Sequence, residues 1–172
     1  MQHFGFLVLF GLFIGTQAVS FEDLLEALNT TEKSWLTKRT YSLQGHSCVY
    51  AQKLSLTREH YTFEQGYKQD GKEKKHTLYS NLGNDGSGPW MTVSRTPDGH
   101  GLKYYLEYLN KNEECGILKV HLSGQDHYEM HQWDNKVGEG AAQCNNQYMT
   151  LLAARTSYNV YSESCKSDAQ SK

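Results

Sequence analysis

This 172-residue sequence has little proline, no large excess of charge of either sign and few long apolar runs. It has 2 prolines, and its acidic and basic residues nearly cancel, with a formal net charge of −2. Such a balance gives no electrostatic reason to expect a nucleic acid or an anionic membrane surface as a partner. Beyond the N-terminal residues, no stretch is apolar enough to be a membrane anchor. Tyrosine, by contrast, is abundant at 12 copies, which together with the scarcity of proline is typical of a β-rich protein.

Motifs of common enzyme classes are also missing. The sequence has no G-x-S-x-G, no H-E-x-x-H and no phosphate-binding G-x-x-x-x-G-K-[ST]. The glycine-rich segment 83–89 lacks the lysine and the following helix of a phosphate site, and we expect it to be a flexible loop. No two cysteines are spaced two to four residues apart, which disfavours zinc. We therefore predict a protein that is not an enzyme and has neither cofactor nor metal.

The N-terminus has the features of a secretory signal peptide. Residues Phe4 to Ile14 form an apolar segment that is too short to cross a bilayer, and the small residue Ala18 follows it. We expect cleavage after Ala18, leaving a single domain over residues 19–172 of a secreted, extracellular protein.

Four cysteines lie in the mature chain, namely Cys48, Cys115, Cys144 and Cys165. An even number in a secreted protein predicts two disulfides, with three possible pairings. The sequon Asn29-Thr30-Thr31 marks Asn29 as a glycosylation site, which would lie at the surface.

Short segments of alternating polarity fill most of the chain. A helix is expected after Ser20, whose side chain caps it, and a second helix over 141–154. Eight strands lie between them, followed by a closing strand over 158–163. These short antiparallel strands predict an up-and-down barrel with the second helix on its wall and room for about one small ligand. The eight predicted strands are 34–43, 48–57, 61–67, 74–82, 90–94, 102–109, 115–122 and 127–133.

The eighth predicted strand carries the strongest candidate site. His127, Glu129, His131 and Trp133 share one face, with neighbours about 6.6 Å apart along the strand. A carboxylate beside an indole suits a cationic ligand, whereas the spacing is wide for a metal ion. Alternatively this face is the solvent side, and the intervening residues fill the core.

Two other charges fall among aromatic residues on predicted strands. Arg39 shares a face with Trp35 and Tyr41, and Glu107 shares one with Tyr105. Such charges either reach solvent at a barrel rim or need a partner or charged ligand if they are buried.

Several segments together resemble the tick salivary lipocalins of the histamine-binding protein family, over nearly all of the mature chain. The order of these segments and the spacing of the four cysteines carry the resemblance. The segments are Ala27-Leu28-Asn29-Thr30-Thr31 with Trp35, Cys48, Cys115-Gly116-Ile117-Leu118-Lys119-Val120, Tyr128-Glu129-Met130-His131, Cys144, and Tyr158-Asn159-Val160-Tyr161 before Cys165.

The resemblance implies an all-β protein, an eight-stranded antiparallel lipocalin barrel with a short N-terminal helix and a C-terminal helix packed on the wall. It implies disulfides Cys48–Cys165 and Cys115–Cys144, and a protein that sequesters host mediators to suppress inflammation at the bite. We expect the protein to be a monomer. Biogenic amines such as histamine or serotonin are the first expectation, and leukotrienes or other fatty-acid mediators the second. A protein-interaction module acting on host immune or complement proteins is a further alternative.

The resemblance also assigns roles to individual residues. Glu129 matches the glutamate of the family's Tyr-Glu-Leu-Trp pattern, His131 replaces its tryptophan, and Trp133 would substitute for that indole. Where amine binders carry an aspartate, this chain has Lys38-Arg39, which favours a ligand with a carboxylate. The predicted ligand-binding residues are Glu129, Trp133, His131, Trp35, Arg39, Tyr41 and Glu107.

Overall fold

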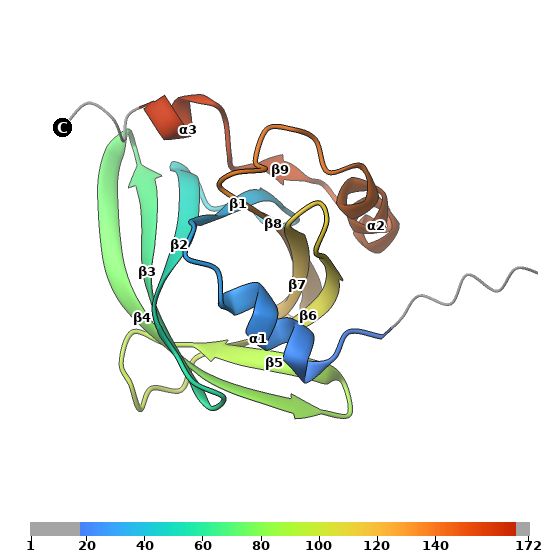
Figure 1. The fold of residues 1–172 in the computed structure, drawn as a ribbon. Coiled ribbons are helices and arrows are strands. Elements are labelled where there is room, and N and C mark those ends of the chain that lie inside the picture. The colour runs from blue at the N-terminus through green and yellow to red at the C-terminus, as the bar shows by residue number, and fades with distance from the viewer. Residues whose placement is uncertain (1–17, 168–172) are drawn as a thin grey trace, which may run out of the picture.

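The computed structural model describes residues 18–167 (Figure 1). The predicted signal peptide therefore lies outside the described residues except for Ala18. Within the described part of the chain, no helix has the length and apolar character that crossing a membrane requires.

A single antiparallel sheet forms the body of the protein. Its order is β2-β3-β4-β5-β6-β7-β8-β1-β9, and an additional pairing between β1 and β2 closes β1 to β8 into a barrel. The predicted all-β lipocalin barrel is thus confirmed. The strands are β1 (Ser34–Arg39), β2 (His46–Leu56), β3 (His60–Gln69), β4 (Lys72–Asp85), β5 (Gly88–Val93), β6 (Leu102–Asn110), β7 (Cys115–Leu122), β8 (Gln125–Trp133) and β9 (Tyr158–Asn159), and the helices are α1 (Phe21–Leu28), α2 (Ala142–Leu152) and α3 (Ser164–Ser167).

The barrel closes in two ways along the seam between β1 and β2. At one end of the seam the strands pair directly, through Trp35 and Tyr50. Further along they diverge, and the segment after β9 fills the gap. There the Val160 N–H donates to the Thr37 carbonyl over 2.9 Å, and the Cys48 N–H donates to the Val160 carbonyl over 2.9 Å. The C-terminal segment therefore completes the wall.

Three segment predictions differ from the structure. The predicted loop 83–89 is a hairpin, with β4 running to Asp85 and β5 beginning at Gly88. Gly83 lies under the Trp90 ring, where a Cβ atom would come within 2.4 Å of Trp90 Cζ2, so this glycine serves close packing within a strand. The first strand ends at Arg39 instead of residue 43, and the closing strand spans two residues instead of six.

Helix α2 lies against β6, β7 and β8, close to the predicted helix 141–154 (Figure 1). It buries Tyr148 and Leu152, which are one helical turn apart, against Ile117 and Met130 of the barrel wall. The disulfide Cys115–Cys144 joins its first turn to β7. The helix is therefore fixed to the wall both covalently and by packing.

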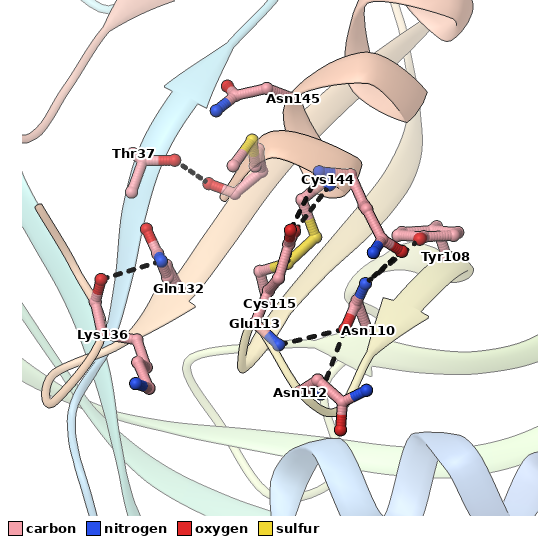
Figure 2. The surroundings of a disulfide bond; sticks show 12 residues. Thr37, Tyr108, Asn110, Asn112, Glu113, Cys115, Gln132, Lys136, Cys144 and Asn145 are labelled. Carbon is pink, nitrogen blue, oxygen red and sulfur yellow. Dashed lines mark hydrogen bonds between the residues drawn. A yellow bond between two sulfur atoms is a disulfide. The ribbon is translucent and has the colours of Figure 1, made fainter. Parts of the chain in front are cut away.

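The start of α2 is capped from outside the helix (Figure 2). Its N-cap residue, Ala141, has no side chain that could accept a hydrogen bond. Instead the Glu113 carboxylate, from the β6–β7 turn, accepts the N–H groups of Gln143 and Cys144, each over 3.0 Å. Asn110 in turn accepts the Glu113 N–H over 3.0 Å, which orders the turn.

The second disulfide, Cys48–Cys165, connects β2 to α3. It lies in a buried cluster with Trp35 and Tyr50 on the outside of the barrel. The Trp35 Nε1–H donates to the Asp134 carboxylate over 2.6 Å. Both disulfides are the pairs that the family resemblance implies.

Helix α1 covers one end of the barrel. A reciprocal capping box between Ser20 and Asp23 begins the helix. Its own residue Leu24 faces the barrel and is 1% exposed. Ion pairs tether the helix to two loops at this end, with 2.6 Å between Arg58 Nη2 and Glu22 and 2.6 Å between Lys111 Nζ and Glu26. The loops β1–β2, β3–β4, β5–β6 and β7–β8 lie at the opposite end.

Candidate ligand-binding site

The barrel encloses a cavity of about 540 Å³. Of the lining residues that the structure describes, Glu129 is the single carboxylate, and Arg39 and Arg95 are the two arginines. The rest of the wall is mostly apolar, with contributions from Leu24, Leu28, Leu36, Val49, Tyr61, Phe63, Leu78, Met91, Val93, Tyr104, Leu106, Leu118 and Leu122.

The two ends of the cavity differ. At the closed end lie Leu24 and Leu28 of α1. At the other end Leu43 and Leu102 line the cavity and yet are 48% and 49% exposed, so the cavity opens to solvent there. We call this opening the mouth.

A β-bulge in β1 determines which residues face the cavity. Leu36 pairs with His131 and Lys38 pairs with Met130, which leaves Thr37 as an extra residue. Leu36 and Arg39 consequently both line the cavity although they are three residues apart. Trp35, which a regular strand would place on the face of Arg39, lies instead in the outer cluster with Cys48 and Cys165.

Arg39 lies at the end of β1 and is 3% exposed. Its Nη2 donates to the carbonyl oxygens of Leu43 and His46, over 3.2 and 3.3 Å, in the β1–β2 loop. The guanidinium carbon lies 5.1 Å from the centre of the Tyr41 ring. Its buried Nε has no acceptor, and in residues 18–167 no carboxylate forms an ion pair with this side chain.

Glu129 is 6% exposed and has two side-chain partners. The Tyr41 hydroxyl donates to its Oε1, and His131 Nε2 lies 3.0 Å from its Oε2 and donates to it when this nitrogen carries a hydrogen. Burial raises the pKa of the Glu129 carboxyl, but His131, the Tyr41 hydrogen bond and the nearby Arg39 charge outweigh burial and lower it below its usual value. Glu129 is therefore ionised at neutral pH.

Tyr104 is a cavity residue that the sequence patterns did not single out. It lines the wall from β6 together with Leu106. Burial, and then the Glu129 charge, raise the pKa of its hydroxyl, and the same two causes raise the pKa of Tyr41. Both tyrosines therefore remain neutral hydrogen-bond donors at physiological pH.

Five of the seven predicted site residues line the cavity, namely Arg39, Tyr41, Glu129, His131 and Trp133. Trp35 is outside because of the bulge. Glu107 is also outside, since β6 turns Tyr104 and Leu106 inward, and its carboxylate forms a 2.6 Å ion pair with Lys119 Nζ. Trp133 has a buried Nε1 without a hydrogen-bond acceptor.

A smaller hollow of about 280 Å³ lies beside α1, and Trp133 borders both it and the cavity. Two of its carboxylates are already engaged, because Glu26 pairs with Lys111 and Glu32 accepts the Asn135 N–H over 2.9 Å.

Glu113, Cys115 and Cys144 also lie close together, but the two sulfurs form a disulfide and Glu113 caps α2. That group is therefore structural.

A closed antiparallel barrel of eight strands around a cavity for one small ligand is the architecture of the lipocalins, a class of small-molecule-binding proteins. The chain belongs to the tick histamine-binding protein family, whose model matches residues 16–167. This is a family of binding proteins, not enzymes. A comparison with curated protein sequences finds no match.

Two solved structures have a similar fold. AM182 in its serotonin complex is 14% identical, with a TM-score of 0.66, over 83% of this chain and 91% of that chain. Japanin from Rhipicephalus appendiculatus bound to cholesterol is 13% identical, with a TM-score of 0.59, over 79% of this chain and 96% of that chain.

Proposed function

We propose that this protein is secreted and sequesters a host mediator that has an apolar body and an anionic head, such as a leukotriene or another fatty acid. The observation that carries the proposal is Arg39, a buried guanidinium in the cavity wall without a carboxylate partner. Burying a charge is costly unless an opposite charge or sufficient hydrogen bonds compensate it. A ligand carboxylate would supply that compensation.

The surroundings of Arg39 support an anionic ligand. Glu129, the one carboxylate among the lining residues described, is already held by Tyr41 and His131. The buried Nε1 of Trp133 and Nε of Arg39 are both donors without acceptors. Two buried donors of cavity-lining residues are thus left without an acceptor in the described part of the chain.

The apolar wall supports a ligand with an extended hydrocarbon body. Tyr61 and Phe63 stack with ring centres 4.9 Å apart, and α1 adds Leu24 and Leu28 at the closed end. A volume of about 540 Å³ lies within the range of roughly 300–1,000 Å³ that is typical of small-molecule sites.

A biogenic amine is the second candidate. Glu129 is ionised, buried and on the same strand face as Trp133, an arrangement that suits a cation with an aromatic ring. The structural neighbour AM182 was solved in complex with serotonin. Against an amine stands Arg39, whose charge would repel it.

Ligand-dependent thermal stability distinguishes these candidates. Arachidonate, leukotriene B4, cholesterol, serotonin and histamine would each be tested on the mature protein and on Arg39→Gln. A ligand at 100 times its dissociation constant adds about 2.7 kcal/mol of stability. We expect the two fatty acids to raise the Tm of the wild type, and the variant to lose most of that shift.

Stabilisation by the amines alone would overturn the fatty-acid proposal in favour of the second candidate. Cholesterol has no anionic group. If it stabilised the protein as strongly as arachidonate, and if Arg39→Gln left that stabilisation unchanged, the site would not be selecting ligands by an anionic head group. No shift with any of these ligands would favour a role in binding a host immune or complement protein.

We further propose that the protein acts outside the cell as a glycosylated monomer and suppresses inflammation at the bite. The apolar N-terminal segment, the two disulfides and the exposed Asn29 support this. Expression of the full chain in insect cells should yield a secreted monomer that begins at Val19, and Asn29→Gln should remove one glycan's mass.

A further inference from the structure

Most basic side chains of the described residues have a partner within the protein. Seven of them form ion pairs, which link Arg58 to Glu22, Lys75 to Glu64, Lys103 to Asp85, Lys111 to Glu26, Lys119 to Glu107, Lys136 to Glu139 and Lys166 to Asp134. Three exposed ones, Lys72, Lys74 and Arg95, form no hydrogen bond, ion pair or cation–π contact with any residue in the range 18–167. These three define what we call the cationic lip.

The two lysines lie on the cavity side of the β3–β4 hairpin. His76 lines the cavity, and side chains two residues apart on a strand share a face. Lys74 and Lys72 continue that face toward the hairpin turn. In register, Lys74 pairs with Tyr67, which also lines the cavity.

This part of β4 extends beyond β5 and borders the mouth. The ladder between β4 and β5 begins at Leu82, with one isolated bridge between Tyr79 and Ser94, so residues 72–78 have no partner strand on that side. In Figure 1 the hairpin of β3 and β4 is the long curved pair of strands at the left.

Arg95 completes the lip from the opposite loop. It follows Ser94, the residue bridged to Tyr79, and it lines the cavity. Arg95 thus lines the cavity, and the two lysines lie on the strand face that continues from the cavity-lining residue His76, in a chain whose formal net charge is −2.

We propose that Lys72, Lys74 and Arg95 form an electrostatic entry site that draws the anionic head of an amphipathic ligand into the mouth and accelerates its association. This inference rests on the proposed function, because it requires an anionic ligand. Cations around a low-dielectric opening raise the local concentration of an anion, and Asp70 and Asp98 of the same loops oppose this effect. They act mainly on the association rate and leave dissociation to the contacts inside the cavity.

Coulomb's law gives the size of the effect. A unit charge about 10 Å from an anion in water raises its local concentration about twofold. Removing three such charges should therefore slow association about eightfold at low ionic strength. The difference should nearly vanish at about 1 M salt, where the screening length is about 3 Å.

The test is stopped-flow binding of the fluorescent fatty acid cis-parinarate to the mature protein. The variant is Lys72→Gln/Lys74→Gln/Arg95→Gln, and Lys136→Gln, away from the mouth, is the matched control. We expect the association rate of the triple variant to fall about eightfold at 10 mM salt, with an unchanged dissociation rate. The control should associate like the wild type.

Asp98 provides a change of the opposite sign. It is exposed in the same loop as Arg95, and Asp98→Asn should accelerate parinarate association about twofold at low salt. If the triple variant associated at the wild-type rate at 10 mM salt, or if only its dissociation rate changed, the proposed entry site would be wrong. The proposed function would not be affected by either result. Failure of the wild type to bind parinarate at all would overturn both.

Discussion

Arg39 and Glu129 are direct partners in the β1–β8 ladder, and both side chains are buried, yet they do not form an ion pair. Each side chain has other hydrogen-bond partners, but those of Arg39 include no carboxylate in residues 18–167. Arg39 is bound to loop carbonyl groups, and Glu129 is bound to Tyr41 and His131. The cavity therefore has a cation and an anion next to each other. A ligand can bind to either side chain without first breaking an ion pair between the two.

Replacing Glu129 by glutamine separates the two ligand classes. Glu129→Gln keeps the shape and one acceptor oxygen for Tyr41 but removes the negative charge. We expect arachidonate affinity to stay the same or rise, because a like charge has been removed, and any amine binding to be lost. Calorimetric titration measures both. Loss of arachidonate binding in a variant that remains folded would contradict this prediction.

Stability should depend on the ionisation of Glu129. Its pKa is lowered in the folded protein, whereas in the unfolded chain a glutamate titrates near about 4.3. As the pH falls below that value the unfolded state takes up the proton first, so stability from Glu129 is complete above it and is lost as the pH approaches the folded pKa.

Urea unfolding between pH 7 and pH 3 would measure this effect. The difference in unfolding free energy between the wild type and Glu129→Gln should shrink as the solution becomes more acidic. A difference that stays constant over this range would show that Glu129 does not titrate as the structure indicates.

Glu113 should stabilise α2 as a cap supplied from another element. Glu113→Ala removes the acceptor for two N–H groups at the start of the helix. We expect a loss of about 1–2 kcal/mol in the free energy of unfolding and faster amide exchange in the first turn of α2. The control Glu139→Ala, which affects an exposed pair with Lys136, should change stability by less than about 0.5 kcal/mol. Equal losses in the two variants would argue against capping.

The two disulfides should differ in their contribution to stability. Cys48–Cys165 spans 117 residues and Cys115–Cys144 spans 29. The restriction of the unfolded chain predicts a loss of about 5 kcal/mol for Cys48→Ala/Cys165→Ala and about 3.5 kcal/mol for Cys115→Ala/Cys144→Ala. Denaturant titration of the two double variants tests this order. Non-reducing peptide mapping that links Cys48 to Cys115 would contradict the pairing itself.

Alternation of polar and apolar residues was sufficient to predict the barrel. It located the strands within a few residues, because one face of each strand is buried. A shift of one residue in the register would expose the apolar side chains of that face. It misjudged the segment around Gly83, since a glycine needed for packing against Trp90 has the same local composition as a flexible loop.

The site was less predictable for a specific reason. The bulge at Thr37 shifts the inward face of β1 by one residue, which moves Trp35 outside and brings Leu36 in, and no turn residue marks it in the sequence. On β6 the alternation separates Tyr104 from the face that carries Lys103 and Glu107, and Glu107 was misplaced because the aromatic ring of Tyr105 on its own face was given more weight than this pattern. Glu113 was missed because a cap from a distant turn depends on the fold.

Helix α1 has a kinetic consequence for the bound state. Because it covers one end of the barrel and is tethered there by Glu22 and Glu26, we expect a ligand to exchange through the mouth. An occupant must leave before its successor can enter, so the rate of displacement should be independent of competitor concentration. If the protein acts as proposed, the time for which a bound ligand is retained is then determined by its own dissociation rate and does not depend on the concentration of free ligand outside.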